Sequence, residues 1–431
     1  MIRTVHLIYV VDDGVATLRC GVGAIAMNFF LAVPKITDHF QDLGIQLRLS
    51  VISIAAHSGA IGIRDDLLKR TKQLCSSLNG ELRMIAPLVR PGQQYFNYPV
   101  WEQYNREASR IIDTLIDSVD TRTIVLANDT IFSHIRLRTP GVWQVWIPHS
   151  LSIVHAQSYA EARVREAWER EAVSYHHHLR DGYVGYISPY VKRILKEVYS
   201  LTERKLVSFG NGFSPTDILD RTRYSPGKIR KMLLSRGIPT NLPLLLSYAR
   251  ADEYKGLDIS ARVMITLAKT MRYHGVLIAS RFSNEDIVDQ VQSRLRRILM
   301  GQSSRITAFF GYEFDLPKYL LRYSQTRMLL HLPSRDFCPL VPFEAEMIGH
   351  QELCVVNSDI PCFSGLINDR YDGFLVRGDS HQITRGVSSI LSMPRAAREA
   401  IVLNGKERTH KVFDIRKNYY VGLSFLLNDM I

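Results

Sequence analysis

Cysteine is scarce in this sequence, and long apolar runs are absent. The five cysteines include no pair at the C-x-x-C spacing of zinc and redox sites. A small, odd number of cysteines is typical of free thiols in a reducing compartment. Nowhere do 18 apolar residues follow one another, which argues against a membrane-spanning helix. We therefore expect a cytoplasmic protein without a metal centre.

Neither a low-complexity tract nor a short repeat interrupts the 431 residues, of which 46% are hydrophobic and 22% charged. This composition is typical of a globular protein, and the length allows two or three domains. A net charge of +12 favours anionic partners. Because the basic residues are scattered, we expect no nucleic-acid partner and at most weak peripheral membrane contact. Composition specifies no oligomeric state.

Short apolar runs alternate with longer amphipathic stretches along the chain, which is the pattern of parallel sheets with helical crossovers. The run at 4–11, which ends at Asp12 and Asp13, is too short for a signal peptide. Two sets of strands predict two doubly wound α/β domains, with a linker at 210–223. Strands are expected at 4–11, 47–55, 123–127, 142–147, 183–187, 205–209, 243–248, 275–279, 306–310, 327–332 and 353–357. Helices are expected at 101–118, 157–179, 258–273 and 284–300.

The most informative segment, 333–349, follows the strand expected at 327–332. Asp336 and Glu344 are separated by seven residues, and Pro342 suits the first turn of a helix. Glu344 would then lie beside the unsatisfied backbone amides of the helix start. Such a helix start attracts a phosphate or a carboxylate.

A second segment places cations after the strand expected at 243–248. Arg250 follows this strand, and Lys255 and Gly256 come five residues later. An arginine can bind two phosphate oxygens at once, and a lysine adds a compact charge. Cations at such a position stabilise the negative charge that builds up on a departing diphosphate.

These two segments resemble the retaining GT-B glycosyltransferases, the glycosyltransferase family 4-like group that includes glycogen synthases and bacterial sugar transferases. The family signature has two acids separated by seven residues, after Pro-Ser and before a glycine; here Pro333-Ser334 and Gly349 flank Asp336 and Glu344. The chain departs from the signature in having Asp as the first acid and Cys338-Pro339 in place of Phe-Gly. It also lacks the Gly-Gly turn after Asp359. The resemblance covers roughly 205–425.

The resemblance implies two Rossmann-like domains that face each other across a cleft. Residues 1–205 would bind the acceptor, 206–410 would bind the nucleotide sugar, and 411–431 would form a helix that packs back on the first domain. The donor would be a nucleoside-diphosphate sugar, with uridine as the preferred base. Its sugar would pass, with retention of configuration, to a hydroxyl or amine of a small molecule or glycan. The resemblance implies no cofactor or metal.

The resemblance also implies roles for individual residues. Glu344 would hold the ribose hydroxyls and Asp336 the hydroxyls of the donor sugar, while Arg250 and Lys255 stabilise the diphosphate. The segment after the strand at 306–310 resembles the turn beside the base, although a plain strand–helix turn explains it equally well. The further donor-binding candidates are Phe337, Cys338, Pro339 and Leu340 near the sugar and phosphate, and Gly311, Tyr312 and Leu316 near the base.

In the N-terminal half, Gly21 and Gly23 match part of a dinucleotide fingerprint, but no acid ends the second strand. The resemblance implies that these glycines face the donor phosphate and acceptor; the alternative is a helix-start turn that needs small residues. His149 follows the strand at 142–147 and would lie against the donor sugar, with His155 as the fallback. The consecutive helical histidines 176–178 point in different directions, so they cannot chelate one ion.

Three other functions are alternatives to sugar transfer. A nucleotide-sugar epimerase or hydrolase would keep the nucleotide residues but would turn over the donor without an acceptor. A non-catalytic partner subunit is favoured by Cys338-Pro339, whereas the presence of Arg250, Lys255 and Glu344 counts against it. An NAD-dependent oxidoreductase is favoured only by Gly21 and Gly23.

Overall fold

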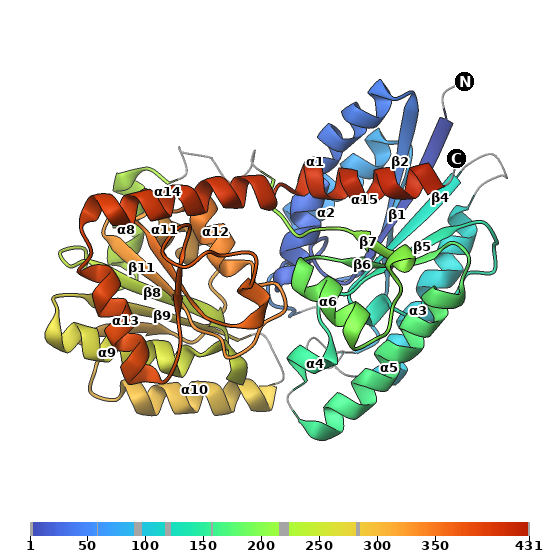
Figure 1. Cartoon of the computed structure of the whole chain (residues 1–431). Helices are drawn as coiled ribbons and strands as arrows, with labels where there is room; N and C mark the ends of the chain where they lie inside the picture. Colours follow the sequence, from blue (N-terminus) through green and yellow to red (C-terminus); the bar gives the residue numbers. More distant parts are fainter. Residues whose placement is uncertain are drawn as a thin grey trace. The chain divides into compact units, whose positions relative to one another are not determined.

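The computed structural model describes residues 3–57, 59–89, 97–116, 122–156, 158–214, 224–281 and 285–429. It divides the chain into two compact units. The first domain comprises Met1–Ser214 with Phe413–Ile431, and the second comprises Pro215–Val412 (Figure 1). Within the described ranges we find no helix with both the length and the apolar character needed to span a bilayer.

The first domain is built on seven parallel strands in the order β3-β2-β1-β4-β5-β6-β7. The direction of the crossovers reverses between β1 and β4, because β2 and β3 lie on one side of β1 and all later strands on the other. The strands are β1 (Arg3–Val11), β2 (Ile45–Ile54), β3 (Leu82–Ile85), β4 (Arg122–Asn128), β5 (Trp143–Ile147), β6 (Gly182–Tyr186) and β7 (Leu206–Ser208). The helices are α1 (Gly21–Asp42), α2 (Asp65–Ser77), α3 (Tyr98–Leu115), α4 (Ser152–His155), α5 (Tyr159–His178), α6 (Pro189–Glu197) and α15 (Ile415–Asp429), with short η1 (Thr130–Phe132) and η2 (Glu203–Lys205).

Strand β1 is buried on both faces, as expected for a central parallel strand. The Tyr9 ring stacks on Phe29 of α1, with 4.5 Å between the ring centroids. Ile8 and Val10 point to the opposite face, where they join the core cluster that includes Tyr104 of α3. Helices therefore cover both sides of the sheet.

The C-terminal helix α15 packs on the first domain, against α1. Its buried Tyr419 lies 4.6 Å from the Phe29 ring, and the Tyr419 and Tyr9 hydroxyls are 3.4 Å apart. The backbone amide of Phe213 donates to the carbonyl of Phe413, which joins the last segment to the end of the first domain. The prediction of a helix that returns to this domain is confirmed.

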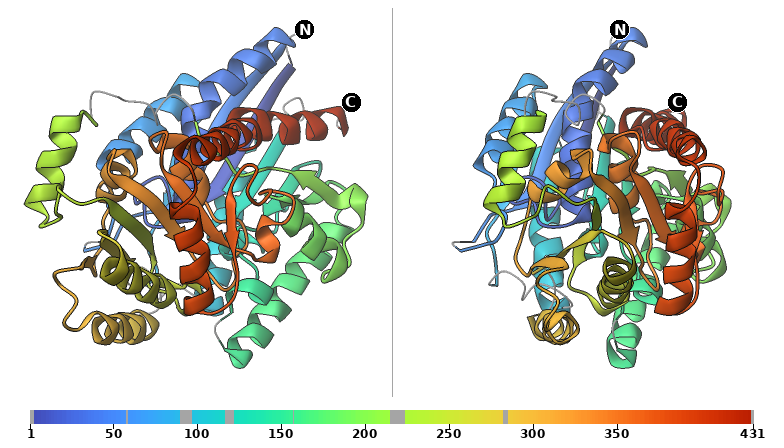
Figure 2. Two further views of the ribbon diagram at one scale, coloured as in Figure 1. Left: turned by 60° about the vertical axis from the view of Figure 1, so that its left-hand side comes forward. Right: turned by 90° about the vertical axis from the view of Figure 1, so that its left-hand side faces the viewer.

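The second domain has six parallel strands in the order β10-β9-β8-β11-β12-β13. Helix α9 packs on α10 and α13, and α12 packs on α11 and α14, so helices cover both faces (Figure 2). The strands are β8 (Leu244–Arg250), β9 (His274–Ser280), β10 (Ile306–Phe309), β11 (Thr326–His331), β12 (Cys354–Ser358) and β13 (Phe374–Val376). The helices are α8 (Pro226–Ser235), α9 (Leu257–Thr270), α10 (Glu285–Leu299), α11 (Leu316–Arg322), α12 (Val341–Ile348), α13 (Ser380–Leu391) and α14 (Arg395–Val412), with short η3 (Glu253–Lys255) and η4 (Pro361–Phe363).

Two doubly wound α/β domains are what the sequence predicts, and the fold class is confirmed. The placement of the strand at 205–209 in the second half is wrong, because β7 pairs with β6 in the first sheet. The first domain consequently extends to Ser214 rather than 205. Of the expected linker at 210–223, residues 215–223 lie outside the described residues. Strands β3 and β13, of four and three residues, were not predicted.

Candidate active site

The catalytic candidates of the second domain gather where its crossovers reverse. Strands β8 and β11 are neighbours, with β9 and β10 on one side and β12 and β13 on the other. Arg250 ends β8, Lys255 lies in η3 directly after it, and Asp336 and Glu344 follow β11. Ligands of open parallel sheets bind at such a point, beyond the carboxyl ends of the strands.

Lys255 and Asp336 form the central pair of this site. Nζ of Lys255 lies 2.7 Å from Oδ2 of Asp336, and the two side chains are 13% and 5% exposed. Gly256 then turns the chain into α9 with φ of +65°. A Cβ atom at this position would lie 1.8 Å from the carbonyl oxygen of Leu332, so only glycine fits. Helix α9 therefore begins immediately beside Lys255, and its amides point to the same strand ends.

Arg250 is held by two neighbours in its own loop. Its Nη2 lies 2.8 Å from the Tyr254 hydroxyl and 3.0 Å from Oδ2 of Asp252. The Ser334 amide donates to the Tyr254 carbonyl at 2.9 Å, which joins the loop after β8 to the loop after β11. The two loops that carry the cations and acids are thus fixed to each other.

Glu344 lies in the first turn of α12, as the sequence predicts, and Tyr248 orients it. The Tyr248 hydroxyl donates to Oε2 of Glu344 at 3.2 Å. Burial, followed by the charge of Glu344, raises the pKa of Tyr248 well above its usual value, so the hydroxyl keeps its proton and remains a donor. Sequence reasoning missed Tyr248. The sequence feature that could have found it is its position two residues before Arg250, because this spacing places both side chains on one face of β8.

The segment 337–340 offers fewer amides than the resemblance implies. Phe337 is buried, and its amide donates to Oδ1 of its neighbour Asp336 at 2.8 Å. Pro339 has no amide hydrogen. One amide of this segment is thus bonded to Asp336, and Pro339 removes another.

Two buried polar residues beside Asp336 were also missed. His331 ends β11 and pairs in register with Asn357 of β12. Nε2 of His331 lies 3.9 Å from Oδ2 of Asp336, and burial lowers the pKa of His331 to about 3, so its ring is neutral. In the described part of the chain, this Nε2 and both amide atoms of Asn357 make no hydrogen bond. Because buried polar atoms without partners are rare in folded proteins, these atoms indicate that water or a ligand binds at this site.

The candidates for the base lie farther along the sheet. Gly311 and Tyr312 follow β10, which is separated from β8 by β9. Leu316 is the first residue of α11 and is buried. A methyl group at Gly311 would meet nothing within 4 Å, so packing does not require glycine there.

In the first domain, one of the two glycines of the predicted phosphate loop packs against a carboxylate of the chain itself. Buried Asp13, after β1, accepts hydrogen bonds from the amides of Arg19 at 2.8 Å and Cys20 at 3.0 Å, just before α1. A Cβ atom at Gly23 would lie 2.2 Å from Oδ2 of Asp13. Packing against Asp13 therefore explains the small residue at 23. Gly21 is exposed at the first position of α1.

His149 follows β5, as expected, and lies beside the end of β4. Its Nε2 is 3.4 Å from Oδ1 of Asn128. Burial lowers the pKa of His149 to about 4, although the charge of Asp129 opposes this. At neutral pH the ring is therefore uncharged, with one nitrogen to donate and one to accept. The fallback His155 lies in α4, with Nδ1 3.3 Å from the Leu151 carbonyl.

Asp12, at the end of β1, was not singled out by the sequence. It is 7% exposed, and its Oδ1 makes no hydrogen bond within the described residues. Burial raises the pKa of Asp12 to about 7; Arg19 lowers it, while Asp13 and Asp129 raise it further. The crossover reversal of the first sheet thus carries a carboxyl group that titrates near neutrality.

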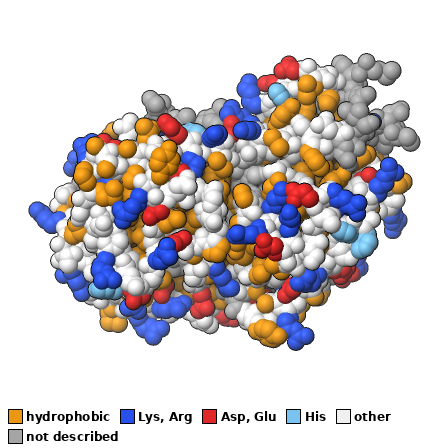
Figure 3. Space-filling model, viewed as in Figure 1, with side chains coloured by type: hydrophobic (Ala, Val, Ile, Leu, Met, Phe, Trp, Pro, Cys, Tyr) orange, Lys and Arg blue, Asp and Glu red, His pale blue; other side chains and the backbone are white. Residues whose placement is uncertain are grey.

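Charged side chains of both signs share the drawn face, and metal ligands do not cluster in the described ranges. On the face drawn in Figure 3, Lys and Arg side chains are interspersed with Asp and Glu. The described ranges contain no group of three or more His, Cys, Asp or Glu side chains that could hold a metal ion. Of the three consecutive histidines in α5, His176 is buried and His178 is exposed.

No protein-family model and no curated protein sequence matches the chain. Solved structures match over almost its whole length. Sucrose-phosphate synthase from Thermosynechococcus elongatus has 15% identity and a TM-score of 0.70, with 99% of each chain covered. Anabaena HepE, in complex with UDP and glucose, has 16% identity and a TM-score of 0.64 over 98% of this chain and 99% of that one. The Escherichia coli trehalose-6-phosphate protein bound to UDP-2-fluoro glucose has 14% identity and a TM-score of 0.69 over 98% of each chain. The chain has the GT-B glycosyltransferase fold.

Proposed function

We propose that this protein is a retaining, metal-independent glycosyltransferase that uses a UDP-sugar as donor. The observation that carries the proposal is the gathering of Arg250, Lys255, Asp336 and Glu344 at the carboxyl ends of β8 and β11. A GT-B fold supports the proposal, although a fold alone does not define a reaction. The uridine base is supported by the UDP and UDP-sugar ligands of two similar structures.

In this proposal the second domain binds the donor. The diphosphate lies at the start of α9, where helix amides, Arg250 and Lys255 supply positive charge. Glu344, oriented by Tyr248, accepts hydrogen bonds from the ribose hydroxyls. Asp336 accepts hydrogen bonds from the hydroxyls of the donor sugar. When the diphosphate binds, the ammonium group of Lys255 is shared between Asp336 and the diphosphate.

The chemical step breaks the bond between the anomeric carbon and the diphosphate oxygen. The acceptor oxygen or nitrogen forms a new bond to the same face of that carbon, and its proton passes to the departing diphosphate. Arg250 and Lys255 stabilise the leaving group, whose charge is greater in the transition state than in the bound donor. These two fixed cations supply the charge that the step needs, so the proposal includes no resident cofactor.

The first domain is proposed to bind the acceptor, a small molecule or glycan. His149 is neutral at physiological pH, so it suits hydrogen bonding to a sugar hydroxyl rather than donation of a full positive charge. Asp12 has an unpartnered oxygen and suits an acceptor hydroxyl or amine. All five cysteines are free thiols, which supports a reducing compartment such as the cytoplasm.

A thermal-shift screen of nucleoside diphosphates tests donor binding, because a ligand of the folded state raises its melting temperature. We expect UDP to raise it more than the other diphosphates, and the Glu344→Gln variant to lose most of this rise. Glu407→Gln, the same substitution at an exposed position of α14, is the matched control. Equal shifts with all diphosphates would contradict the uridine assignment, and no shift with any would contradict donor binding.

Turnover then separates the proposal from its alternatives. Incubation with a UDP-sugar should release UDP at an appreciable rate only when an acceptor is present. UDP release or sugar epimerisation at full rate without an acceptor would identify a hydrolase or epimerase instead. Binding of UDP without turnover under any acceptor would identify a non-catalytic subunit.

A further inference from the structure

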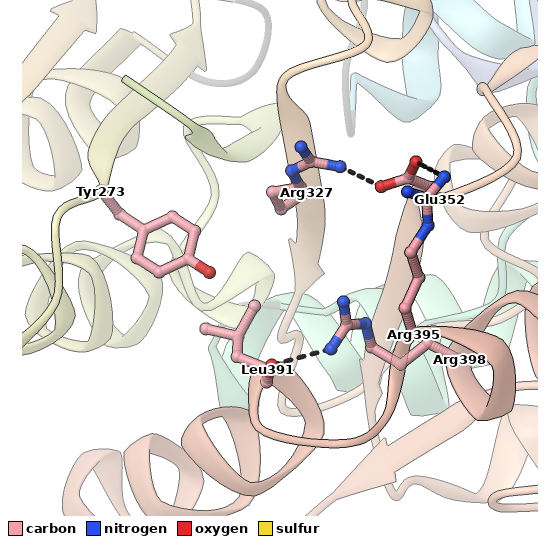
Figure 4. A pocket seen from close by; sticks show the side chains of 6 residues that line it. All are labelled: Tyr273, Arg327, Glu352, Leu391, Arg395 and Arg398. Carbon is pink, nitrogen blue, oxygen red and sulfur yellow. Dashed lines mark hydrogen bonds and ion pairs between the residues drawn. The ribbon is translucent and has the colours of Figure 1, made fainter. Parts of the chain in front are cut away.

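A recess of about 290 Å³ lies at the amino ends of strands in the second sheet (Figure 4). Its walls come from the amino ends of three strands and from the turn between α13 and α14. Since β11 has six residues, its two ends are about 20 Å apart, and the recess is separate from the candidate active site. The lining residues are Tyr273, Arg327, Glu352, Leu391, Arg395 and Arg398.

The lining carries three guanidinium groups and a single carboxylate. Glu352 pairs with Arg327 and also with Arg395, whose Nη2 lies 2.5 Å from Oε1. Nε of Arg395 also lies 2.8 Å from Oε1 of Glu399, one turn farther along α14. Three guanidinium groups thus face two carboxylates, which leaves the recess with a net positive charge. Glu352 holds the guanidinium groups of Arg327 and Arg395 together on one wall of the recess.

Arg398 contributes the third cation from α14. Its Nη1 donates to the carbonyls of Leu391, at 2.8 Å, and Met393, at the end of α13. Figure 4 shows the rest of this guanidinium group turned toward the recess. Within the described residues its Nε and Nη2 make no hydrogen bond, so they are available to a ligand.

The start of α14 increases the positive potential. The helix begins at Arg395 after Pro394, which offers no side-chain acceptor to the first amides, and its first turn contains no acid. Cations are normally disfavoured at this end of a helix dipole. Two arginines in the first turn of one helix, beside a third from β11, are an arrangement that a bound anion would stabilise.

Tyr273 adds a neutral donor on the opposite wall. Its hydroxyl points into the recess in Figure 4. Burial raises the pKa of Tyr273, and this is the largest effect. The charges of Arg398 and, more weakly, Arg327 lower it, so the hydroxyl lies within electrostatic range of both guanidinium groups. The hydroxyl and the guanidinium groups therefore face a common space from different elements.

We propose that this recess binds the phosphate group of a small molecule, either inorganic phosphate or a phosphate monoester. Guanidinium groups match the geometry of phosphate oxygens and bind them in pairs. The volume is at the lower end of the range for small-molecule pockets and admits one phosphate group with a short substituent. The inference is independent of the sugar-transfer proposal, because none of its residues belongs to the donor site.

Isothermal titration with inorganic phosphate tests the site in full-length protein that carries Lys255→Ala, which weakens phosphate binding at the donor site. We expect one phosphate per chain, and at least tenfold weaker binding after Arg395→Gln or Arg398→Gln is added. Arg385→Gln, an exposed substitution on α13, is the matched control and should leave affinity unchanged. Glycerol phosphate in a second titration distinguishes a monoester site from a site for free phosphate.

Two design features keep the test decisive. Arg398 also bonds the end of α13, whereas Arg395 is 68% exposed, so the Arg395 variant should fold normally even if the Arg398 variant does not. Sodium chloride at matched ionic strength separates specific binding from general screening. Absence of phosphate binding to the parent protein, or equal binding to the folded Arg395→Gln variant, would overturn the proposal.

Discussion

The two sheets reverse their crossovers in the same way, but the loops at these two points differ in charge. In the first domain, the chain places its own carboxylate, Asp13, before the start of α1. In the second domain, the corresponding helix α9 begins after Lys255 and Gly256, with no side chain that caps it. The loop before α1 thus holds an anion of the chain on its own amides, whereas the loop before α9 carries Arg250 and Lys255.

This difference shows that a glycine-containing strand–helix turn does not by itself identify a phosphate site. Gly23 is explained by the carboxylate that it accommodates, and Gly256 by its close approach to Leu332. The loop after β8 differs in carrying the cations Arg250 and Lys255, next to the acids Asp336 and Glu344 that follow β11. The following predictions test this comparison, in order of decreasing expected effect.

Lys255→Ala should have the largest effect. Loss of one preorganised cation at the leaving group should lower kcat by about 10²- to 10³-fold. Steady-state kinetics with a UDP-sugar and acceptor would measure this. Lys269→Ala, at the exposed end of α9, is the control and should retain full activity. Equal activity of the two variants would show that the cation of the second loop does not act on the diphosphate.

Asp12→Asn should change the pH dependence of stability. The pKa of Asp12 is raised from 3.8 to about 7, so the folded protein binds a proton that the unfolded chain releases between these values. This contribution to stability is lost as the pH rises through about 7. Relative to wild type, the free energy of unfolding of Asp12→Asn should therefore increase by about 2–4 kcal/mol between about pH 5 and pH 8.

Urea unfolding at several pH values would measure this difference. Asp38→Asn, an exposed change on α1, serves as the control and should show no such trend. A constant difference between Asp12→Asn and wild type across this range would show that Asp12 is ionised in the folded protein.

Gly23→Ala should destabilise the first domain by about 1–3 kcal/mol, because the added methyl group overlaps Oδ2 of Asp13. Gly21→Ala, at the exposed first position of α1, should cost less. Thermal and urea unfolding would compare the two variants. If Gly23→Ala instead kept its stability and lost donor affinity, the loop would be a ligand site like that of the second domain.

Glu344→Gln should weaken UDP binding by about tenfold, because a neutral acceptor holds the ribose hydroxyls less strongly. Tyr248→Phe, which removes only the group that orients Glu344, should weaken it by about threefold. Isothermal titration would measure both. A larger loss with Tyr248→Phe than with Glu344→Gln would mean that Tyr248 contacts the nucleotide itself.

Much of the fold could be predicted because strands of buried parallel sheets are continuous apolar runs. The run at 4–11 and the runs at 243–248 and 327–332 became β1, β8 and β11. The strand at 205–209 was also found, but its sheet was assigned wrongly, since pairing with β6 depends on distant residues. Of the candidate site, the charged residues were predicted from their spacing and from the resemblance to the glycosyltransferase family. Tyr248, His331 and Asn357 were missed because they look like ordinary strand residues.

By itself, the sequence determined where strands end and which charged residues follow them, because apolar runs, prolines and glycines act over a few neighbouring positions. Only the tertiary structure decided that β8 lies next to β11, which brings Lys255 within 2.7 Å of Asp336 across 81 positions of sequence. It alone also assembled the arginine recess from three strand ends and the helices α13 and α14. Such contacts depend on the order of strands in a sheet, and that order is set by the packing of the whole domain.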